Sequence, residues 1–309
     1  MLQLNYIREN KEDVLKRLAI KNFKDAESII NSVLIKDTQR RSLQQEGDTI
    51  KAESNQIAKQ IGELMKSGKK EEAEKVKLCT AELKQKEKEL DEQLKTVEDE
   101  IQQLLVLVPN TPNLTVPLGK TPEDNAVVFE HGEKPKLAAG YVPHWDLTTK
   151  YNLIDFELGV KIAGAGFPVY KGKCARLQRA LINFFLDRAT AKGYLEVQPP
   201  IVVNEDSGYG TGQLPDKEGQ MYHCTVDNLY LIPTAEVPVT NIYRDVILKE
   251  ADLPINNTAY TPCFRREAGS YGKDVRGLNR LHQFDKVEIV QITHPDKSYE
   301  TLEEMREYV

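Results

Sequence analysis

The chain has 309 residues, which is enough for about two domains, and 40% of them are hydrophobic, enough for a substantial core. Acidic residues outnumber basic ones by 48 to 42, a net charge of −6, so the composition excludes capture of nucleic acid by bulk charge. The mean hydropathy is −0.51, no apolar run reaches the roughly 18 to 20 residues of a membrane span, and the charged N-terminus excludes a signal peptide. We therefore expect a soluble, cytoplasmic protein without a membrane partner.

The chain changes character near residue 108. All fifteen prolines lie at or after Pro109, and residues 1–108 hold only three of the eighteen glycines and two of the twenty-two aromatic residues. Because proline interrupts helices, this first stretch predicts a domain of long helices. The prolines clustered over residues 109–122 predict a linker, since that stretch can be neither helix nor central strand. Residues 123–309 then form a second domain.

Two consecutive heptad patterns lie in the first domain. The first pattern and its companion positions comprise Ile29, Leu43, Ile50, Ile57, Leu64, Val33 and Ile61, and the second comprises Val76, Leu83, Leu90, Val97, Leu104, Ala73, Leu94, Ile101 and Val108. The connection Lys66–Lys70 is so short that the two helices must fold back as an antiparallel coiled coil. The sequence predicts an arm over about residues 29–108, with helices on the order of 50 Å long.

The arm by itself permits two interpretations. It could be a dimerisation or spacer coiled coil, or a probe that reaches a distant part of a large partner. Basic and acidic residues are balanced, 20 against 21 over residues 1–108, so a strong electrostatic footprint is missing. The arm alone therefore does not decide the function.

The second domain mixes helices and strands. A helix is predicted over Arg176–Ala189, with apolar positions at Leu177, Leu181, Phe184 and Phe185. The predicted extended segments are Tyr194–Val203, interrupted by Pro199 and Pro200, then Tyr230–Ile232, Tyr260–Arg266 and Leu281–Ile292, followed by a helix over residues 294–309. These elements predict the α+β class, with an antiparallel sheet flanked by helices.

The four cysteines, Cys79, Cys174, Cys224 and Cys263, lie far apart and form no CxxC pair. Only His223, beside Cys224, offers a neighbouring metal-ligand side chain. We expect free thiols in a reducing compartment and no metal held by this chain.

Residues 261–288 are the most informative stretch. Two predicted strands flank a loop whose composition is typical of a mobile connection that closes over a ligand, with Gly269, Gly272 and Gly277 together with Lys273, Asp274 and Arg276. On the first strand, alternation places Arg265 and Glu267 on one face. On the second strand it places four side chains on one face, namely Arg280, His282, Phe284 and Glu288.

These residue types fit a ligand that carries phosphates, a planar ring and an ammonium group. Arginine binds phosphate, phenylalanine stacks on a base, and glutamate pairs with an ammonium group. The alternative is a surface ladder of ion pairs with Phe284 packed inward. Spacing alone leaves both interpretations open.

The segments CFRREAGSYGKD and GLNRLHQFDKVE resemble motif 2 of the class II aminoacyl-tRNA synthetases. Their sequences are similar to those of the bacterial seryl-tRNA synthetases. Three other blocks agree, namely MLQLNYIREN at the start, GTGQLP at Gly210–Pro215 and LIPTAEVPVTN at Leu231–Asn241. The region Phe184–Val203 resembles motif 1, whose proline, here Pro200, lies at the dimer interface. The resemblance covers the whole chain.

The resemblance implies a class II antiparallel sheet flanked by helices, preceded by a coiled-coil arm that binds tRNA. It implies that L-serine and ATP, with Mg²⁺, form seryl adenylate, and that serine then passes to tRNA(Ser). The expected partners are tRNA(Ser), L-serine, ATP and a second copy of the chain, with no DNA. His282 and His131 receive no catalytic role, because the reaction requires no acid–base step.

The family's site residues carry over by position. Arg265 and Arg280 are the expected catalytic residues, on the α-phosphate and the terminal phosphates. The expected ATP-binding set is Arg265, Arg266, Glu267, Arg280 and Phe284, with Phe284 under the adenine. The expected serine-binding set is Thr234, Ala235, Glu236 and Glu288.

Members of that family continue beyond Val309 with a part that contains motif 3. If the polypeptide ends at Val309, we expect a damaged ATP site with weak or no activity, an open sheet edge liable to aggregate, and an unpartnered apolar stripe on the last helix, formed by Tyr299, Leu302, Met305 and Val309. The other interpretation, which we favour, is that the sequence is part of a normal, longer enzyme. One alternative function is a non-catalytic fragment of such an enzyme that binds tRNA or another partner. Another is a related ligase that loads a carrier protein, which the intact heptads of the arm argue against.

Overall fold

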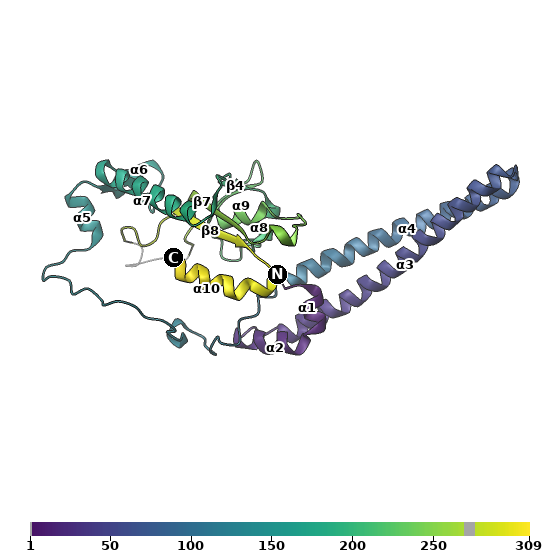
Figure 1. Cartoon of the computed structure of the whole chain (residues 1–309), viewed down its shortest axis with the longest axis horizontal. Helices are drawn as coiled ribbons and strands as arrows, with labels where there is room; N and C mark the ends of the chain where they lie inside the picture. The colour runs from purple at the N-terminus through teal and green to yellow at the C-terminus, as the bar shows by residue number, and fades with distance from the viewer. Residues whose placement is uncertain (1, 269–275) are drawn as a thin grey trace. The chain divides into compact units, whose positions relative to one another are not determined.

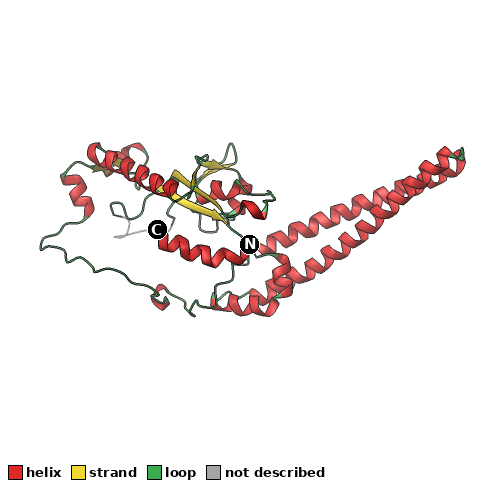
Figure 2. Cartoon of the chain, viewed as in Figure 1, coloured by secondary structure: helices red, strands yellow, loops and turns green. Residues whose placement is uncertain are grey.

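A computed structural model describes residues 2–268 and 276–309, without the side chains of residues 72, 73, 75, 78 and 79. The chain divides into two compact units, Met1–Glu133 and Lys134–Val309 (Figures 1 and 2). Within the described residues, no helix combines the length and the apolar character that a membrane span requires. The predicted loop residues Gly269, Gly272, Lys273 and Asp274 lie outside the described part, as does the side chain of Cys79.

The first unit is helical, as the absence of proline predicts. Its helices are α1 (Leu4–Glu9), α2 (Lys11–Ile20), α3 (Ala26–Lys66) and α4 (Lys70–Leu105). Helices α3 and α4 run side by side in opposite directions and form the arm (Figure 1). At 1.5 Å per residue, the 41 residues of α3 span about 60 Å. The predicted antiparallel hairpin is confirmed.

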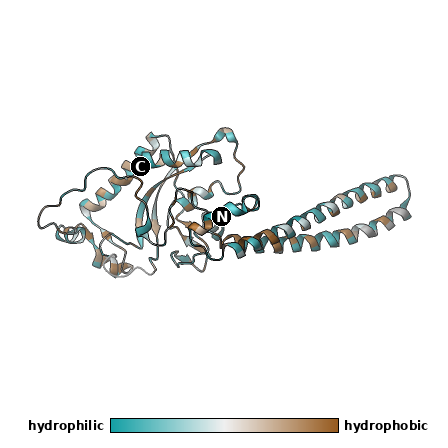
Figure 3. Ribbon diagram, turned by 90° about the horizontal axis from the view of Figure 1, so that it is seen from below, coloured by the Kyte–Doolittle hydropathy of each residue, from teal (hydrophilic) through white to brown (hydrophobic). Residues whose placement is uncertain are grey.

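Apolar burial is concentrated at the base of the arm. There, buried residues of α3 and α4 pack against α1 and α2, namely Ile7, Val14, Leu18, Ile30, Val33, Val97 and Ile101. Toward the tip, the heptad positions Ile57, Ile61 and Leu64 are only half-buried. Apolar segments recur along both helices (Figure 3). The base therefore holds most of the stabilising apolar contact.

Asp37 of α3 is buried at this base among three arginines. Its carboxylate lies 2.9 Å from Arg8 of α1, 3.0 Å from Arg40 and 3.3 Å from Arg41. Burial alone would raise the pKa of this carboxyl group, but the hydrogen bonds and charges of Arg8 and Arg40 outweigh it and hold the pKa below its ordinary value. The cluster thus fastens α1 to the root of the arm.

The segment between α4 and α5 (His144–Lys150) is irregular apart from one short turn of 3₁₀-helix, η1 (Pro122–Asp124). It includes the predicted linker over residues 109–122. The Asn22 side chain donates a hydrogen bond of 2.8 Å to the carbonyl of Gly119 and so ties this segment to the turn after α2. The domain boundaries at residues 108 and 122 stay predictions.

The second unit combines short sheets with helices, and the predicted α+β class is confirmed. Its remaining elements are β1 (Ile154–Asp155), α6 (Phe156–Ile162), β2 (Val169–Tyr170), α7 (Gly172–Ala191), β3 (Leu195–Glu196), β4 (Val202–Val203), α8 (Glu205–Gly210), β5 (His223–Cys224), β6 (Leu229–Leu231), α9 (Glu236–Asn241), η2 (Glu250–Asp252), β7 (Ile255–Phe264), β8 (Gln283–Ile292), η4 (Pro295–Lys297) and α10 (Ser298–Tyr308). Strands β7 and β8 form a long antiparallel ribbon.

One pairing differs from the predicted antiparallel sheet. Strand β3 runs parallel to β7, so the three-stranded sheet β3-β7-β8 is mixed. Parallel neighbours need a long crossover, and residues 197–254, which hold β4, β5, β6, α8 and α9, supply it. The remaining strands pair antiparallel, in the sheets β1-β2 and β4-β6-β5.

Helix α7 packs against β7 and β8, and a hydrogen bond joins it to β8. The Gln178 amide donates to Asp285 of β8, and the Tyr260 hydroxyl of β7 donates to the same carboxylate at 2.6 Å. Burial, and then Asp285, raise the pKa of Tyr260. The predicted helix is confirmed, but its apolar side chains face solvent. Leu177, Leu181, Phe184 and Phe185 are each about half exposed.

The last helix, α10, also carries exposed apolar side chains. Tyr299, Leu302 and Val309 of the predicted stripe are exposed, and Met305 is half-buried. Tyr308 stacks on Tyr194, with ring centroids 5.9 Å apart, and this contact ties the helix to the segment before β3.

The Asp37 cluster predicts a pH dependence of stability in the first unit. Because its pKa is lower in the folded state than in the unfolded state, the stabilisation is present above the unfolded pKa and is lost as the pH falls through the folded pKa. We expect Asp37→Asn to lower the free energy of unfolding at neutral pH by about 2 kcal/mol, since a carboxylate with charged donors is lost. Urea titrations from about pH 7 down to about pH 2 measure both effects.

Asp91→Asn serves as the control, because Asp91 is half exposed and pairs with Lys51 on the surface of the arm. This change should leave the unfolding free energy nearly unaltered. The difference between the wild type and Asp37→Asn should shrink toward low pH. A difference that stays constant over the whole titration would contradict the role given to the Asp37 charge.

Candidate functional site

The ribbon of β7 and β8 presents one continuous face of functional side chains. Phe284, Lys286 and Glu288 alternate along β8, so they point to the same side. The register places small, buried residues opposite them, namely Cys263, Thr261 and Ala259. On this face, the large polar and aromatic groups of β8 therefore lie beside a row of small, buried residues of β7.

At one end of this face, Glu288 accepts three hydrogen bonds. The Thr234 hydroxyl donates at 2.6 Å, the backbone N–H of Glu236 donates at 3.0 Å, and Lys286 Nζ donates at 3.3 Å. Lys286 Nζ also donates to the Thr234 hydroxyl at 2.6 Å. The cluster holds one carboxylate and one ammonium group in fixed positions on a partly buried surface.

The turn between β6 and α9 brings Thr234 to this cluster, and Glu236 follows as the first residue of α9. Ile232 in this turn is fully buried, and its carbonyl accepts a hydrogen bond of 2.8 Å from the N–H of Phe264 at the end of β7. Ala235 is also fully buried and packs with Val239 of α9. Of the predicted serine-binding residues, Thr234 and Glu288 touch directly, and Ala235 contributes packing.

Glu236 enters the site through its backbone rather than its side chain. Its N–H donates to Glu288, whereas its side chain is exposed. The sequence pattern could not separate these two modes, because it carries no information on where the side chain points at the first residue of a short helix.

At the other end of the face, an arginine lies over the aromatic ring. The guanidinium carbon of Arg265 lies 5.1 Å from the centroid of Phe284, within the range of a cation–π contact. Arg265 directly follows β7 and its N–H donates to the carbonyl of His282 at 2.9 Å. This backbone bond extends the pairing of the two strands by one position.

The predicted alternation is wrong for Glu267 and Arg280. Strand β7 ends at Phe264 and β8 begins at Gln283, and Glu267 has a left-handed backbone with φ of 48°. The two side chains nonetheless meet, with Arg280 Nη1 3.4 Å from Glu267 Oε2. Arg266 is exposed, and its N–H donates to the carbonyl of Gln220 at 2.8 Å.

His282 lies before β8 rather than on it, and its contacts are structural. Its Nδ1 lies 2.7 Å from the Tyr222 hydroxyl, its ring stacks on Phe167 at 5.4 Å, and its N–H donates to the carbonyl of Gly166. His131 belongs to the first unit, where its ring stacks on Phe129 at 6.2 Å.

Lys286 is the site residue that sequence reasoning missed. The available signal was its place midway between Phe284 and Glu288, which puts all three on the same face of a strand. The sequence analysis did not assign Lys286 to the site, because an isolated lysine in a strand is usually a solvated side chain.

The remaining expectations concern cysteines, metal and Pro200. Cys174, Cys224 and Cys263 are free thiols, and burial raises the pKa of Cys263. Among the residues that the structure describes, no group of three or more histidine, cysteine, aspartate or glutamate side chains could hold a metal ion. Pro200 is exposed between β3 and β4.

Two family profiles match the chain. The profile of the seryl-tRNA synthetase N-terminal domain matches residues 1–112, and that of the class II tRNA synthetase core domain (G, H, P, S and T) matches residues 222–309. The chain is 47% identical to the serine–tRNA ligase of Salinibacter ruber over 307 residues, which cover 99% of this chain and 72% of the relative. Identity to the serine–tRNA ligase of Geobacter sulfurreducens is also 47%, covering 99% and 71%.

Solved structures agree with these relatives. The seryl-tRNA synthetase of Pyrococcus horikoshii complexed with ATP superposes with a TM-score of 0.79 at 31% identity, covering 99% of this chain and 73% of that one. The cytoplasmic serine–tRNA ligase of Naegleria fowleri in complex with AMP gives the same TM-score at 27% identity, covering 100% and 71%.

The Lys286–Glu288 pair predicts a measurable coupling. Lys286→Met or Glu288→Gln alone leaves the other charge in a partly buried place, and each change should lower the free energy of unfolding by about 1 to 2 kcal/mol. The double variant should lose less than the sum of the two, with a coupling of about 1 kcal/mol. Urea unfolding of the four proteins measures this coupling.

The matched control is the exposed pair Lys297 and Glu300 of the same unit. The same substitutions there should give almost no coupling, because water screens the two charges. Strictly additive losses at Lys286 and Glu288 would contradict the linked cluster.

Proposed function

The chain belongs to the seryl-tRNA synthetase family, and on that premise we propose that the ribbon face of β7 and β8 binds L-serine beside ATP and joins them. A carboxylate oxygen of serine attacks the α-phosphorus of ATP, the bond to the β-phosphate breaks, and pyrophosphate leaves. The product, seryl adenylate, then transfers serine to the terminal ribose of tRNA(Ser) and releases AMP. The observation that carries this proposal is the common face of Arg265, Phe284, Lys286 and Glu288.

The nucleotide end of the face is assigned to Arg265 and Phe284. Phe284 is proposed to stack on the adenine, and Arg265 to bind the α-phosphate. The 5.1 Å between the guanidinium and the ring suits two parts of one nucleotide. Arg280 is proposed to bind the terminal phosphates, and Glu267, its ion-pair partner, to orient it near ATP. Arg266 completes the set, with its exposed side chain at the rim.

The amino-acid end is assigned to Glu288 and Lys286. Glu288 is proposed to accept the serine ammonium group, and Lys286 to bind the serine carboxylate. Thr234 and the N–H of Glu236 hold Glu288 in place, and buried Ala235 packs behind them. A serine hydroxyl that completes a hydrogen bond here would be preferred over alanine by about 1 to 3 kcal/mol.

Catalysis is proposed to rest on alignment and on fixed positive charge. The attacking serine carboxylate and the α-phosphate are both anionic, so the cations of Arg265 and Lys286 lower the cost of bringing them together. Mg²⁺ is proposed to arrive with the ATP phosphates, since it commonly binds through substrate phosphates and few protein carboxylates. No step here depends on a protein acid or base.

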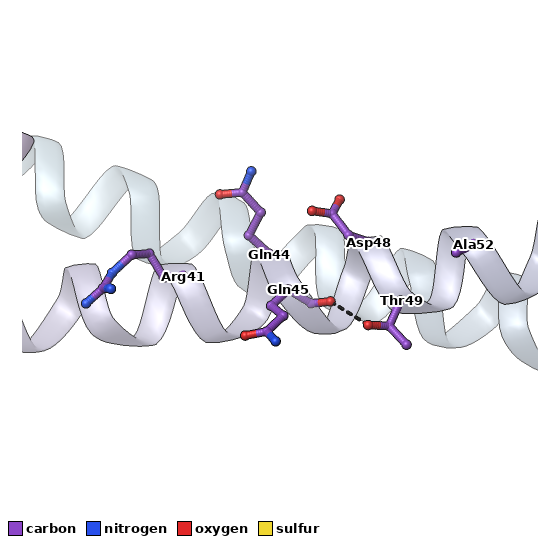
Figure 4. Close-up of a pocket in the computed structure, with 6 residues that line it drawn as sticks. All are labelled: Arg41, Gln44, Gln45, Asp48, Thr49 and Ala52. Carbon is purple, nitrogen blue, oxygen red and sulfur yellow. Dashed lines mark hydrogen bonds between the residues drawn. The ribbon is translucent and has the colours of Figure 1, made fainter.

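The arm of the first unit is proposed to bind tRNA(Ser). α3 carries a shallow depression of about 550 Å³, which exposed side chains of this helix line (Figure 4). The lining residues are Arg41, Gln44, Gln45, Asp48, Thr49 and Ala52. Such a surface suits hydrogen bonds to RNA rather than capture by bulk charge. We accordingly assign residues 1–108 to tRNA binding, 109–122 to a linker and 123–309 to catalysis.

A homodimer is proposed on the basis of α7. Four half-exposed apolar side chains line that helix, and a second copy would remove them from water. Exposed Pro200, which follows β3, is proposed to lie at the same interface. The cytoplasm is the proposed location.

Serine-dependent exchange between ATP and pyrophosphate tests the catalytic proposal. We expect exchange with L-serine and much less with alanine, glycine or threonine. Glu288→Gln should raise the KM for serine by about 10- to 100-fold, because an amide cannot balance the ammonium charge, while the KM for ATP changes little.

Glu300→Gln is the control, because Glu300 is exposed on α10. It should leave both KM values as they are in the wild type. Exchange driven equally by alanine, or a Glu288→Gln variant with the wild-type KM for serine, would refute the site assignment.

A further inference from the structure

The segment from Gly277 to His282 leads into β8, and a contact between a histidine and a glycine holds each of its ends. At the β8 end, the His282 ring occupies the place where a side chain on Gly166 would lie. At the other end, the His144 ring does the same for Gly277. Arg280, the proposed ligand of the terminal phosphates, lies between these two contacts. The backbone that carries Arg280 is therefore held on both sides.

His144 makes the more distant of these contacts in sequence. It is the first residue of α5, and its Nε2 accepts a hydrogen bond of 2.8 Å from the N–H of Leu278. Gly277 has a φ of 66°, and an added Cβ would overlap the imidazole. The His144 ring also meets Trp145 edge-on, with centroids 5.0 Å apart. The imidazole of His144 therefore restrains the segment in two ways, through the hydrogen bond from Leu278 and through its close packing against Gly277.

The acceptor role fixes the chemical state of His144. A nitrogen that accepts a hydrogen bond carries no proton, so the ring is bound as the neutral form with Nε2 unprotonated. The bonded N–H belongs to Leu278, two residues before Arg280. Nothing in the reaction proposed above uses His144.

We propose that His144 is a positioning residue for Arg280 and, through it, for the terminal phosphates of ATP. The proposal rests on the function proposed above. Arg280 is more than half exposed, and a long arginine side chain loses substantial rotamer freedom when it binds. A fixed backbone at Arg280 limits the positions that the Arg280 guanidinium can reach, and it keeps this guanidinium beside Glu267. His144 thereby lowers the entropy lost when ATP binds.

Substitutions at His144 test this role through the two substrates separately. His144→Phe keeps the ring but removes the acceptor, and it should raise the KM for ATP in the exchange assay by about 3- to 10-fold. The KM for serine should stay within about twofold of the wild type, since Lys286 and Glu288 lie on the strand itself. His144→Gln, which can offer an amide oxygen near the same place, should restore most of the affinity for ATP.

Gly277→Ala tests the same contact between His144 and Gly277 by changing the glycine instead of the histidine. The new methyl group would displace the imidazole, so the KM for ATP should rise as in His144→Phe. In a His144→Ala background, which removes the ring, Gly277→Ala should have a smaller effect. Gly132→Ala is the matched control, because Gly132 also has a positive φ, of 81°, but has open space around it.

The outcomes separate the two proposals. If a wild type shown to be folded gives no serine-dependent exchange, the non-catalytic fragment is favoured, and the proposed function fails together with this inference. If the wild type is active but His144→Phe and Gly277→Ala keep its KM for ATP, only the role of His144 is refuted. Equal rises in the KM for ATP and serine, together with a lower melting temperature, would show a general structural role instead and would also refute it.

Discussion

The register of β7 against β8 is the constraint on which the site depends. Side chains alternate along a strand, so a slip of one residue would turn Phe284, Lys286 and Glu288 to the opposite side of the ribbon. The opposite side of β8 carries Asp285, which α7 and Tyr260 hold by hydrogen bonds. These bonds oppose such a slip, because it would leave a carboxylate without its donors. The hydrogen bonds to Asp285 on one face of the ribbon thus stabilise the register that places Phe284, Lys286 and Glu288 on the other face.

The sequence predicted the elements whose signal is periodic. The heptads gave the two arm helices, and the alternation along β8 placed Phe284 and Glu288 on one face. The signal failed where the backbone leaves regular structure, as at Glu267, whose left-handed conformation ends the alternation. Periodicity also carries no information on contacts between distant segments, so it was the family resemblance, and no local pattern, that grouped Thr234 with Glu288.

Exposure of apolar groups was the least predictable property. The apolar positions of α7 have the spacing of a helix that faces a core, yet the core-facing contacts of this helix include Gln178 with Asp285. Spacing reports that a helix has two faces and does not report what covers the apolar one. In the first unit the same kind of pattern is satisfied within the chain, because α4 returns along α3. The difference is that, in the part of the chain that the structure describes, the apolar side chains of α7 remain half exposed.

The account predicts that one ligand spans the ribbon face from Phe284 to Glu288. A crystal structure with a non-hydrolysable sulfamoyl analogue of seryl adenylate tests this most directly, because the analogue contains both the base and the amino acid. The adenine should lie against Phe284 and the ammonium group should contact the Glu288 carboxylate. An analogue bound elsewhere, or one that leaves either residue untouched, would contradict the account.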